Sequence, residues 1–360
     1  MSDDIEKLEQ IRKKIDSIDL QFLDLLNQRA KLACQVAAIK KKQKEPIYYR
    51  PEREAQVLRN IVSQNQSPIA DREVARIFRD IMTACLSLQK EMTIGYLGPE
   101  GTFTHQAAVK HFGEGAVSKP LNSIEEVFQE ISGNHLDYGV VPIENTTQGM
   151  VTQTLDQLLI SDVQICGEIM LRVRQHFACL PETKEIKTIF SHSQSLAQCR
   201  SWLAKHYPNA EKIAVESNAF AAIKAKETPH SACICGQQAI DHYGLENRHA
   251  NVEDYANNST RFIIIGQQCP APSGKDKTSL IISSPHKAGS LSNLLKPFDE
   301  HQINMTLIES RPYQHRNWTY LFFIDFEGHQ DEPHIKSALE SLASMSVMMT
   351  LLGSYPQATG

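Results

Sequence analysis

The first forty residues carry hydrophobic side chains at a spacing of three and four. No Gly or Pro interrupts the chain before Pro46, so the pattern predicts one helix of about 40 residues, roughly 60 Å long at 1.5 Å per residue. Such a stripe needs a partner helix to cover it. Arg29 stands where the stripe calls for a hydrophobic residue, which indicates a register-setting charge or a buried binding group. The stripe is Leu8, Ile11, Ile15, Ile18, Phe22, Leu25, Leu32, Val36 and Ile39.

Two further helices are predicted at about 52–62 and 71–90, after a break that contains Pro46 and Pro51. After Met92 the pattern changes to short β-rich runs that alternate with helical segments, which is typical of an α/β domain. The runs expected to form strands are 93–97, 138–143, 164–169, 188–192, 212–217, 231–236 and 261–266.

The stretch 266–277 is rich in Pro, Gly, Ser and Lys and is predicted to be a linker. The remaining segments alternate as strand, helix, strand, strand, helix and strand, which predicts a ferredoxin-like α+β sandwich. They cover 278–284, 290–302, 304–312, 318–328, 333–345 and 347–356. We therefore expect a multidomain chain with an all-α domain (1–92), an α/β domain (93–268) and an α+β domain (277–356).

Composition excludes several classes of protein. The 360 residues are 41% hydrophobic and carry a net charge of −5, which is ample for two or three domains and gives no sign of nucleic-acid binding. The acidic N-terminus lacks an apolar stretch and 18 apolar residues never run together, so we expect a cytoplasmic protein without membrane contact. Eight cysteines without CxxC spacing favour neither a disulfide framework nor a metal site.

Cationic residues recur along the N-terminal helix. Lys40 follows Arg29 by about three turns, so both project from one face roughly 16 Å apart and could converge on a small anion. Arg12 lies about 26 Å before Arg29 and is turned some 100° away, so an antiparallel partner helix would be needed to bring it to the same ligand. Each charge taken alone is explained by solvation or by packing along the stripe, but the place of Arg29 favours binding.

The middle domain has strand–helix junctions rich in hydroxyls and amides, at 144–147, 191–195 and 258–261, and a helix cap near Thr102 or Thr104. A single Ser or Thr is best explained as a helix cap. Several helix N-termini together indicate an anion site, because their N–H groups and dipoles attract carboxylates. The chain shows no GxSxG elbow, catalytic-cysteine signature or P-loop, which favours cofactor-free chemistry on an anion.

The residues also resemble known families. The order of Arg12, Arg29, Lys40, Arg53-Glu54 and Gln89 is similar to the motif of the all-helical chorismate mutases. The strings GPEGTF, VPIENT, SQSLAQC and NSTRF are together typical of prephenate dehydratases. Nearly the whole chain thus resembles the bifunctional chorismate mutase/prephenate dehydratase family. Its C-terminal part resembles the ACT domains that regulate such enzymes, with a GALV-like segment at 288–291 and ESRP at 309–312.

For the helical domain the resemblance implies a chorismate site. The pericyclic rearrangement to prephenate needs no nucleophile, metal or proton transfer, only a compactly held dianion and donors aimed at the ether oxygen. Lys40 and Gln89 are the implied donors, Glu54 accepts from the ring hydroxyl, and Arg29 is expected to be buried against the substrate. Arg50 and Cys85 stand where such mutases often carry Asp and Ser. The implied substrate-binding residues are Arg29, Lys40, Arg53, Glu54, Cys85 and Gln89 of one subunit with Arg12 of the other, and Arg29, Lys40 and Gln89 are the implied catalytic ones.

For the middle domain the resemblance implies two lobes like those of a periplasmic binding protein, with the active site between them. Thr260 would be catalytic, helping the hydroxyl to leave as prephenate loses water and carbon dioxide to give phenylpyruvate. Because a threonine is a poor acid at neutral pH, we expect a hydrogen-bond donor or relay. Arg261 is expected to meet a substrate carboxylate, with a structural ion pair as the alternative. The expected substrate-binding residues are Glu144, Asn145, Thr146, Ser193, Gln194, Ser195 and Arg261.

The ACT resemblance implies an L-phenylalanine sensor. The expected effector residues are Ala288, Gly289, Ser290, Leu291, Glu309, Ser310, Arg311 and Pro312. The predicted protein is thus a homodimer, or a dimer of dimers, that needs no cofactor or metal and makes phenylpyruvate from chorismate under phenylalanine feedback. Two alternatives stay open: a non-catalytic, amino-acid-responsive anion-binding protein, and a dehydratase whose helical domain only dimerises.

Overall fold

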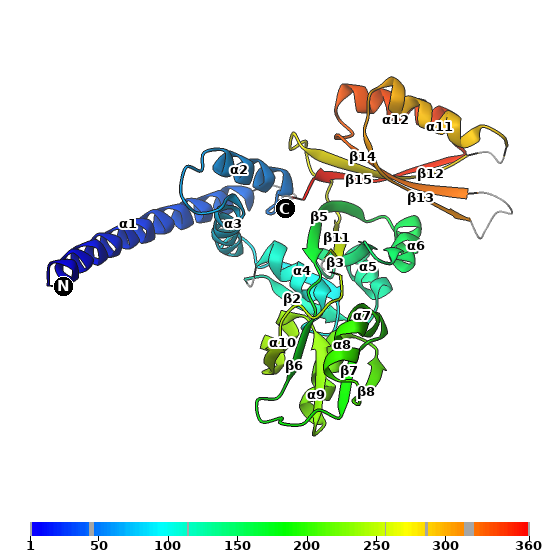
Figure 1. Ribbon diagram of the computed structural model, residues 1–360. Coiled ribbons are helices and arrows are strands. Elements are labelled where there is room, and N and C mark those ends of the chain that lie inside the picture. The colour runs from blue at the N-terminus through cyan, green and yellow to red at the C-terminus, as the bar shows by residue number, and fades with distance from the viewer. Residues whose placement is uncertain are drawn as a thin grey trace.

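The computed structural model describes residues 2–42, 47–113, 115–255, 257–284, 287–312 and 320–358. Pro46 of the predicted break, and the first two residues of the strand expected at 318–328, lie outside these ranges. Three parts follow one another along the chain: a helical part with a long projecting helix, a two-lobed α/β part, and an α+β part (Figure 1). The multidomain fold predicted from the sequence is confirmed.

The helical part contains α1 (Ser2–Lys40), α2 (Pro51–Ser63) and α3 (Asp71–Ser87). Most of α1 extends away from the rest of the chain (Figure 1). As a result the hydrophobic stripe stays uncovered, with exposed fractions between 42% at Val36 and 64% at Ile39. Arg29 is exposed as well, so the prediction that it is buried is wrong for the single chain. Helix α3 contacts α1, but most of α1 projects beyond it, which leaves the Arg29 side chain open to solvent.

The first lobe is a mixed sheet in the order β2-β1-β3-β11-β5, with the short β4 paired to β3. Strand β11 runs antiparallel to both of its neighbours. The strands are β1 (Thr93–Leu97), β2 (Val117–Leu121), β3 (Tyr138–Asn145), β4 (Gly149–Met150), β5 (Gln164–Arg172) and β11 (Ser259–Gly266), and the helices are α4 (Phe103–Phe112), α5 (Ile124–Ser132) and α6 (Thr152–Ile160).

The second lobe is a sheet in the order β10-β6-β9-β7-β8. The chain enters this lobe after β5 and returns to the first lobe at β11, so two crossings connect the lobes. The resemblance implied two lobes. The strands are β6 (His176–Cys179), β7 (Thr188–His192), β8 (Glu211–Val215), β9 (Ser231–Cys235) and β10 (Glu246–His249), and the helices are α7 (Ser193–Gln198), α8 (Arg200–His206), α9 (Asn218–Glu227) and α10 (Gln237–Tyr243).

The C-terminal part is an antiparallel sheet in the order β13-β14-β12-β15 with two helices on one face. Strands β12 and β14 are buried on both faces, whereas β13 alternates between partly buried and exposed residues. Leu280 and Ile282 pack in a core with helices α11 and α12, whereas Ile281 between them packs in the core of the first lobe. The strands are β12 (Asp276–Ser283), β13 (Met305–Pro312), β14 (Tyr320–Glu327) and β15 (Met348–Pro356), and the helices are α11 (Ser290–Glu300) and α12 (Pro333–Met345).

The predicted linker is anchored rather than loose. Strand β12 already begins at Asp276, whose carboxylate accepts hydrogen bonds from the backbone N–H groups of Ser273 and Gly274 at 2.8 and 3.0 Å. Gln56 of α2 donates to the carbonyl of Pro272 at 3.3 Å. The C-terminal part is therefore docked on the first lobe by a shared core and by its connection. Within the described ranges, no helix has the length and apolar character to cross a bilayer.

Candidate functional site

A cavity of about 380 Å³ lies within the helical part, where α1, α2 and α3 meet. It brings together six of the residues predicted for one site: Arg29, Lys40, Arg53, Glu54, Cys85 and Gln89. Arg50, the other noted departure from the mutase pattern, lines it too. Arg12 does not, because it lies on the same straight helix as Arg29, about 26 Å away. One chain therefore supplies four cations, one carboxyl and one amide to this cavity.

Two of the polar groups in the cavity lack strong partners of their own. Arg29 donates one long hydrogen bond, 3.4 Å, to the carbonyl of Ile81. Gln89 Oε1 is buried and has no hydrogen-bond partner among the described residues. Because buried amides normally have partners, an unpaired one beside a cavity indicates a place for a ligand. Rotation of the amide by 180° would present its N–H donors to the same place.

Lys40 is held at the end of α1. Its Nζ donates to the carbonyl of Tyr48 at 3.0 Å. Burial and the neighbouring charge of Arg50 lower the pKa of Lys40. One hydrogen bond leaves the other two ammonium donors available to a ligand.

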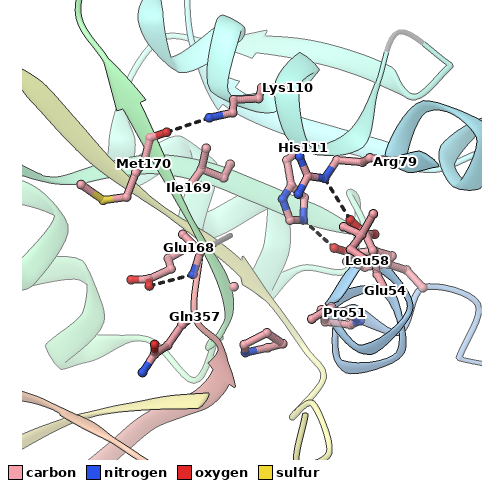
Figure 2. A pocket seen from close by; sticks show the side chains of 15 residues that line it. Pro51, Glu54, Leu58, Arg79, Lys110, His111, Glu168, Ile169, Met170 and Gln357 are labelled. Atoms are coloured by element: carbon pink, nitrogen blue, oxygen red, sulfur yellow. Dashed lines mark hydrogen bonds and ion pairs between the residues drawn. The ribbon is translucent and has the colours of Figure 1, made fainter. Parts of the chain in front are cut away.

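Glu54 stands between this cavity and a smaller one of about 50 Å³ (Figure 2). Burial raises the pKa of Glu54 to about 7, although Arg79, with its Nε 3.4 Å from Oε1, opposes the shift. The carboxyl group therefore changes its charge near neutral pH. When ionised it is only an acceptor, which suits a ligand hydroxyl.

The neighbouring lobe completes the wall of the large cavity. Met92, His111 and Phe112 line it together with Tyr49. Burial lowers the pKa of His111 to about 3 and raises that of Tyr49, so the imidazole is neutral and the Tyr49 hydroxyl donates to His111 Nε2 at 2.5 Å. Helix α4 follows the helical part in sequence, and nothing in its composition points to this cavity. Sequence reasoning missed these residues for that reason.

A separate cavity of about 190 Å³ lies between the two lobes. Four of the predicted residues line it: Asn145, Gln194, Ser195 and Thr260. Helix N-termini border it, since Thr102 caps α4 and Ser217 caps α9, each by accepting a backbone N–H bond. Such ends favour negative ligand groups. Sequence reasoning did not assign the lining residues Phe103, Val173, Gln175, His192, Gln198, Glu216, Ser217 and Asn218 to the site.

The hydroxyl of Thr260 is oriented by Asn145. Thr147 donates its backbone N–H (3.0 Å) and its hydroxyl (2.6 Å) to Asn145 Oδ1. This fixes the amide, so its Nδ2 donates to Thr260 Oγ1 at 2.8 Å. Thr260 is thus an acceptor toward Asn145, and no acceptor for its own proton appears among the described residues. The proton is left for a ligand in the cavity.

Ser195 has a similar environment. Its Oγ accepts from Gln175 Nε2 at 2.9 Å and from Asn218 Nδ2 at 2.8 Å. Two donors occupy both lone pairs of the oxygen, so the Ser195 hydroxyl can only donate further. The interlobe cavity is therefore lined by hydroxyl donors and helix ends, as an anion site requires.

Other predicted residues lie outside this cavity. Thr146 Oγ1 accepts from the backbone N–H of Ser259 at 3.0 Å and so holds a loop. Ser193 and Glu144 are not among the lining residues. Arg261 points away from the cavity, because successive strand residues face opposite sides, and its Nε donates to Glu168 at 2.7 Å. The structure thus favours the structural ion pair over a substrate contact for Arg261, and the expectation of a substrate carboxylate is corrected.

The predicted effector segments share one end of the C-terminal sheet. Strands β12 and β13 are both antiparallel to β14, so their C-terminal ends lie together, next to 288–291 and 309–312. Ser290 Oγ is buried without a partner among the described residues. Arg311 is engaged by the first lobe, because its Nη1 donates to Asp156 at 2.8 Å and to the carbonyl of Thr152 at 3.2 Å.

Comparison with known proteins places each part in a family. Family models match as chorismate mutase type II over 11–90, prephenate dehydratase over 94–270 and ACT domain over 278–344. A bifunctional chorismate mutase/prephenate dehydratase of Pseudomonas aeruginosa is 48% identical, with 99% of each chain covered, and one of Aquifex aeolicus is 41% identical, with 98% of this chain and 99% of that one covered. The crystal structure of a prephenate dehydratase from Arthrobacter aurescens in complex with L-Phe is 30% identical with a TM-score of 0.69, covering 73% of this chain and 90% of that one.

Proposed function

The chain belongs to the family of bifunctional chorismate mutase/prephenate dehydratases, and we propose that its two cavities divide that family's two reactions between them. The enzyme rearranges chorismate to prephenate, then dehydrates and decarboxylates prephenate to phenylpyruvate. We assign the mutase to 1–92, the dehydratase to 93–268 and the regulatory ACT domain to 277–356. The observation that carries the mutase assignment is the convergence on one cavity of Arg29, Lys40 and Gln89, whose Oε1 has no partner within the described ranges.

In the mutase cavity, Arg29 and Arg53 pair with the substrate carboxylates, and bidentate guanidinium geometry suits them to that role. Lys40 and Gln89 donate to the ether oxygen, which gains negative charge as the C–O bond breaks. Glu54 accepts from the ring hydroxyl, and Cys85 lies against the substrate. Catalysis then consists of orientation and electrostatic stabilisation, since the rearrangement moves only electron pairs within the ring system.

A second copy of the chain completes this site. Helix α1 spans residues 2–40, so two copies laid antiparallel along their full length would place Arg12 of one opposite Ala30 of the other, beside Arg29. The same pairing covers the exposed stripe. A homodimer thus accounts for the stripe and for the distance between Arg12 and Arg29. Pairs of dimers through the regulatory domain remain compatible with this arrangement.

In the interlobe cavity, prephenate lies with its carboxylates toward the helix N-termini, and Gln194, Ser195 and Asn145 bind it. Thr260 donates a hydrogen bond to the ring hydroxyl and relays to it a proton taken up from solvent water, so that the hydroxyl leaves as water when the C–O bond breaks. The bond between the ring and its carboxylate breaks with it, carbon dioxide leaves, and the released electron pair completes the aromatic ring. Aromatisation supplies the driving force, so a neutral hydroxyl donor suffices. Glu144, Thr146 and Ser193 support this cavity from the adjoining loops.

Regulation is assigned to the C-terminal domain. We assign L-phenylalanine to the end of the sheet formed by 288–291 and 309–312, where the Ser290 hydroxyl has no partner among the described residues. The complex of the Arthrobacter aurescens relative with L-Phe supports this choice of effector. All eight cysteines are free thiols, and six of them are buried. Free thiols suit a reducing compartment, and we place the enzyme in the cytoplasm.

Two absorbance assays on the purified chain test the proposal. We expect loss of chorismate in one and appearance of phenylpyruvate from prephenate in the other. A chain that binds prephenate without turnover would be an anion-binding protein. A chain that makes phenylpyruvate from prephenate but leaves chorismate unchanged would be a dehydratase with a dimerising helical domain.

A further inference from the structure

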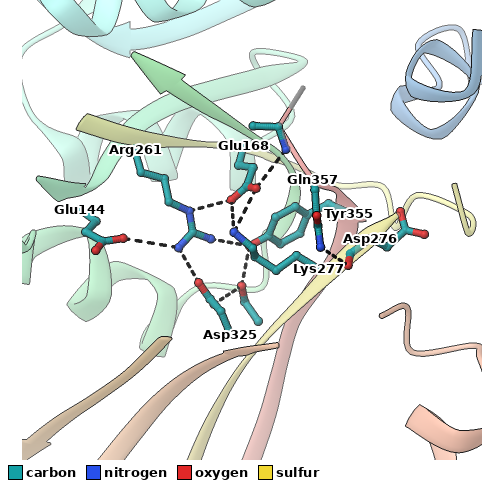
Figure 3. Close-up of polar contacts among 10 residues, drawn as sticks. Glu144, Glu168, Arg261, Asp276, Lys277, Asp325, Tyr355 and Gln357 are labelled. Carbon is teal, nitrogen blue, oxygen red and sulfur yellow. Dashed lines mark hydrogen bonds and ion pairs between the residues drawn. The ribbon is translucent and has the colours of Figure 1, made fainter. Parts of the chain in front are cut away.

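A buried cluster of charges joins the regulatory sheet to the strand that carries Thr260. Arg261 of β11 contacts Glu168 of β5 and Asp325 of β14, and the side chains of these residues are only 5%, 4% and 6% exposed. Lys277 of β12 bonds both Glu168 oxygens at 3.0 and 2.8 Å. Figure 3 shows these groups converging between the two sheets. The pairs of Arg261 with Asp325 and of Lys277 with Glu168 cross from one sheet to the other, so the cluster persists only while the sheets stay docked.

The hydrogen bonds around Arg261 form a closed, directional ring. Arg261 Nη1 donates to Asp325 Oδ2 at 2.5 Å, and Nη2 donates to the Tyr355 hydroxyl at 2.9 Å. The Ser279 hydroxyl donates to Asp325 Oδ1 at 2.5 Å and lies 2.7 Å from the Tyr355 hydroxyl. Because guanidinium only donates and carboxylate only accepts, Tyr355 must donate to Ser279. Every bond in the ring depends on its neighbours, and three of its four members belong to the regulatory domain.

The ring acts on the same short segment that presents the catalytic hydroxyl. Strand β11 pairs Thr260 with Asn145 and Arg261 with Glu144 on β3, and a register shift follows directly between Arg261 and Phe262. Glu144 also lies 3.8 Å from the Arg261 guanidinium. Thr260 and Asn145 face the cavity, while their neighbours face the regulatory sheet. A shift of Arg261 therefore turns Thr260 relative to Asn145.

We propose that Arg261 is a positioning residue for Thr260, and that Asp325 and Tyr355 of the regulatory domain hold it in place. The Thr260 hydroxyl then points correctly toward the substrate only while the regulatory sheet is docked as described. The inference deepens the proposed function, on which it rests for the identity of the effector: L-phenylalanine acts by loosening or shifting this ring. The Arg311–Asp156 ion pair also joins the regulatory domain to the first lobe. It is a poor carrier of the signal, because ion pairs near the surface contribute little free energy.

The test uses the full chain and two ring variants, Asp325→Asn and Tyr355→Phe, with Ser354→Ala as the matched control. Ser354 neighbours Tyr355 on β15, but its hydroxyl pairs with Thr278 inside the regulatory domain at 2.8 Å. Dehydratase kcat and KM, inhibition by L-phenylalanine and direct calorimetric binding of L-phenylalanine are measured on each chain. Mutase activity should be unchanged in these chains, since its cavity shares no residue with the ring, and retained binding of L-phenylalanine reports a folded regulatory domain.

We expect both ring variants to lower dehydratase kcat by roughly fivefold or more, with little change in the KM for prephenate. L-phenylalanine should bind them with nearly unchanged affinity yet inhibit them less than it inhibits wild type. Ser354→Ala should match wild type in all four measurements. If Asp325 and Tyr355 had only a structural role, their substitution would not be expected to weaken inhibition by L-phenylalanine while leaving its binding unchanged.

Tyr355→Phe removes one hydroxyl and keeps the buried charges paired, so it should fold where Asp325→Asn does not. A folded Tyr355→Phe chain with wild-type kcat and wild-type inhibition would overturn the proposal. If wild type turns over prephenate but L-phenylalanine neither binds nor inhibits, the effector assignment fails instead. The kcat of the ring variants then still decides whether Arg261 positions Thr260.

Discussion

Replacing Gln89 by glutamate tests the electrostatic account of the mutase site. An amide can donate a hydrogen bond at any pH, whereas a carboxyl group donates only when it is protonated. Gln89 lines the cavity with a buried oxygen that has no partner among the described residues, so Gln89→Glu keeps the shape of the side chain and exchanges the amide donor for a titratable carboxyl group. We expect the variant to lose mutase activity progressively as the pH rises.

The magnitude follows from the titration of the new carboxyl group. With an ordinary glutamate pKa of about 4.3, roughly one molecule in 500 would be protonated at pH 7, which corresponds to about 3.7 kcal/mol at about 1.36 kcal/mol per pH unit. Burial would raise this pKa, and the nearby cations Arg29 and Lys40 would lower it. These effects move the midpoint but not the slope, which stays near tenfold per pH unit above the midpoint.

Loss of chorismate is followed from pH 5 to pH 8, and each variant rate is divided by the wild-type rate at the same pH. The ratio cancels the titration of Glu54, which both chains share. Gln64→Glu, which adds the same charge at an exposed position outside the cavity, is the control and should give a constant ratio. A constant ratio for Gln89→Glu as well would show that Gln89 does not donate to the ether oxygen.

Three further predictions follow from the sites. Arg29→Ala should bring mutase activity below about a tenth of wild type, since a lost charge-assisted pair costs on the order of 2 kcal/mol. Dehydratase activity should stay intact. Mutase activity above about a tenth of wild type would exclude a contact between Arg29 and a substrate carboxylate. Arg12→Ala and Arg29→Ala chains should each be inactive as mutases but regain mutase activity when they are refolded together, because one of the two sites in the heterodimer carries neither substitution. Verified heterodimers without recovered activity would mean that each site is built within one chain. Mutase kcat/KM should rise with pH, with a midpoint near 7, as the buried carboxyl group of Glu54 ionises. Glu54→Gln should abolish that rise; a rise that survives the substitution would assign it to another group.

The sequence predicts the elements whose pattern is uninterrupted. Helix α1 follows from forty residues with one period and no breaker, and the six-element C-terminal sandwich follows from its alternation. Strands β2, β6 and β10 escape prediction for different reasons. β2 is an exposed edge strand with a proline at position 120, β6 has only four residues, and β10 is polar throughout. Pairing in the sheet, rather than local propensity, makes these segments strands.

Site residues can be predicted from the sequence where their placement depends on one helix. They cannot be predicted where their placement depends on how separate elements pack against one another. The common face of Arg29 and Lys40 follows from helical geometry. The contribution of His111 to the mutase cavity does not, because it depends on how α4 packs against α2 and α3. Arg261 shows the same limit: its neighbour Thr260 lines the cavity, but only the docked regulatory sheet reveals which partners the guanidinium meets.

The most direct measurement gives chorismate to a Thr260→Val chain and follows every product. Valine keeps the volume of the side chain and removes only the hydroxyl that Asn145 orients. We expect prephenate to accumulate at the wild-type rate while phenylpyruvate formation falls by about 10²-fold or more; wild type should convert chorismate fully to phenylpyruvate. Phenylpyruvate formed at the wild-type rate by Thr260→Val would contradict the account, because the dehydration would then not use the hydroxyl between the two lobes.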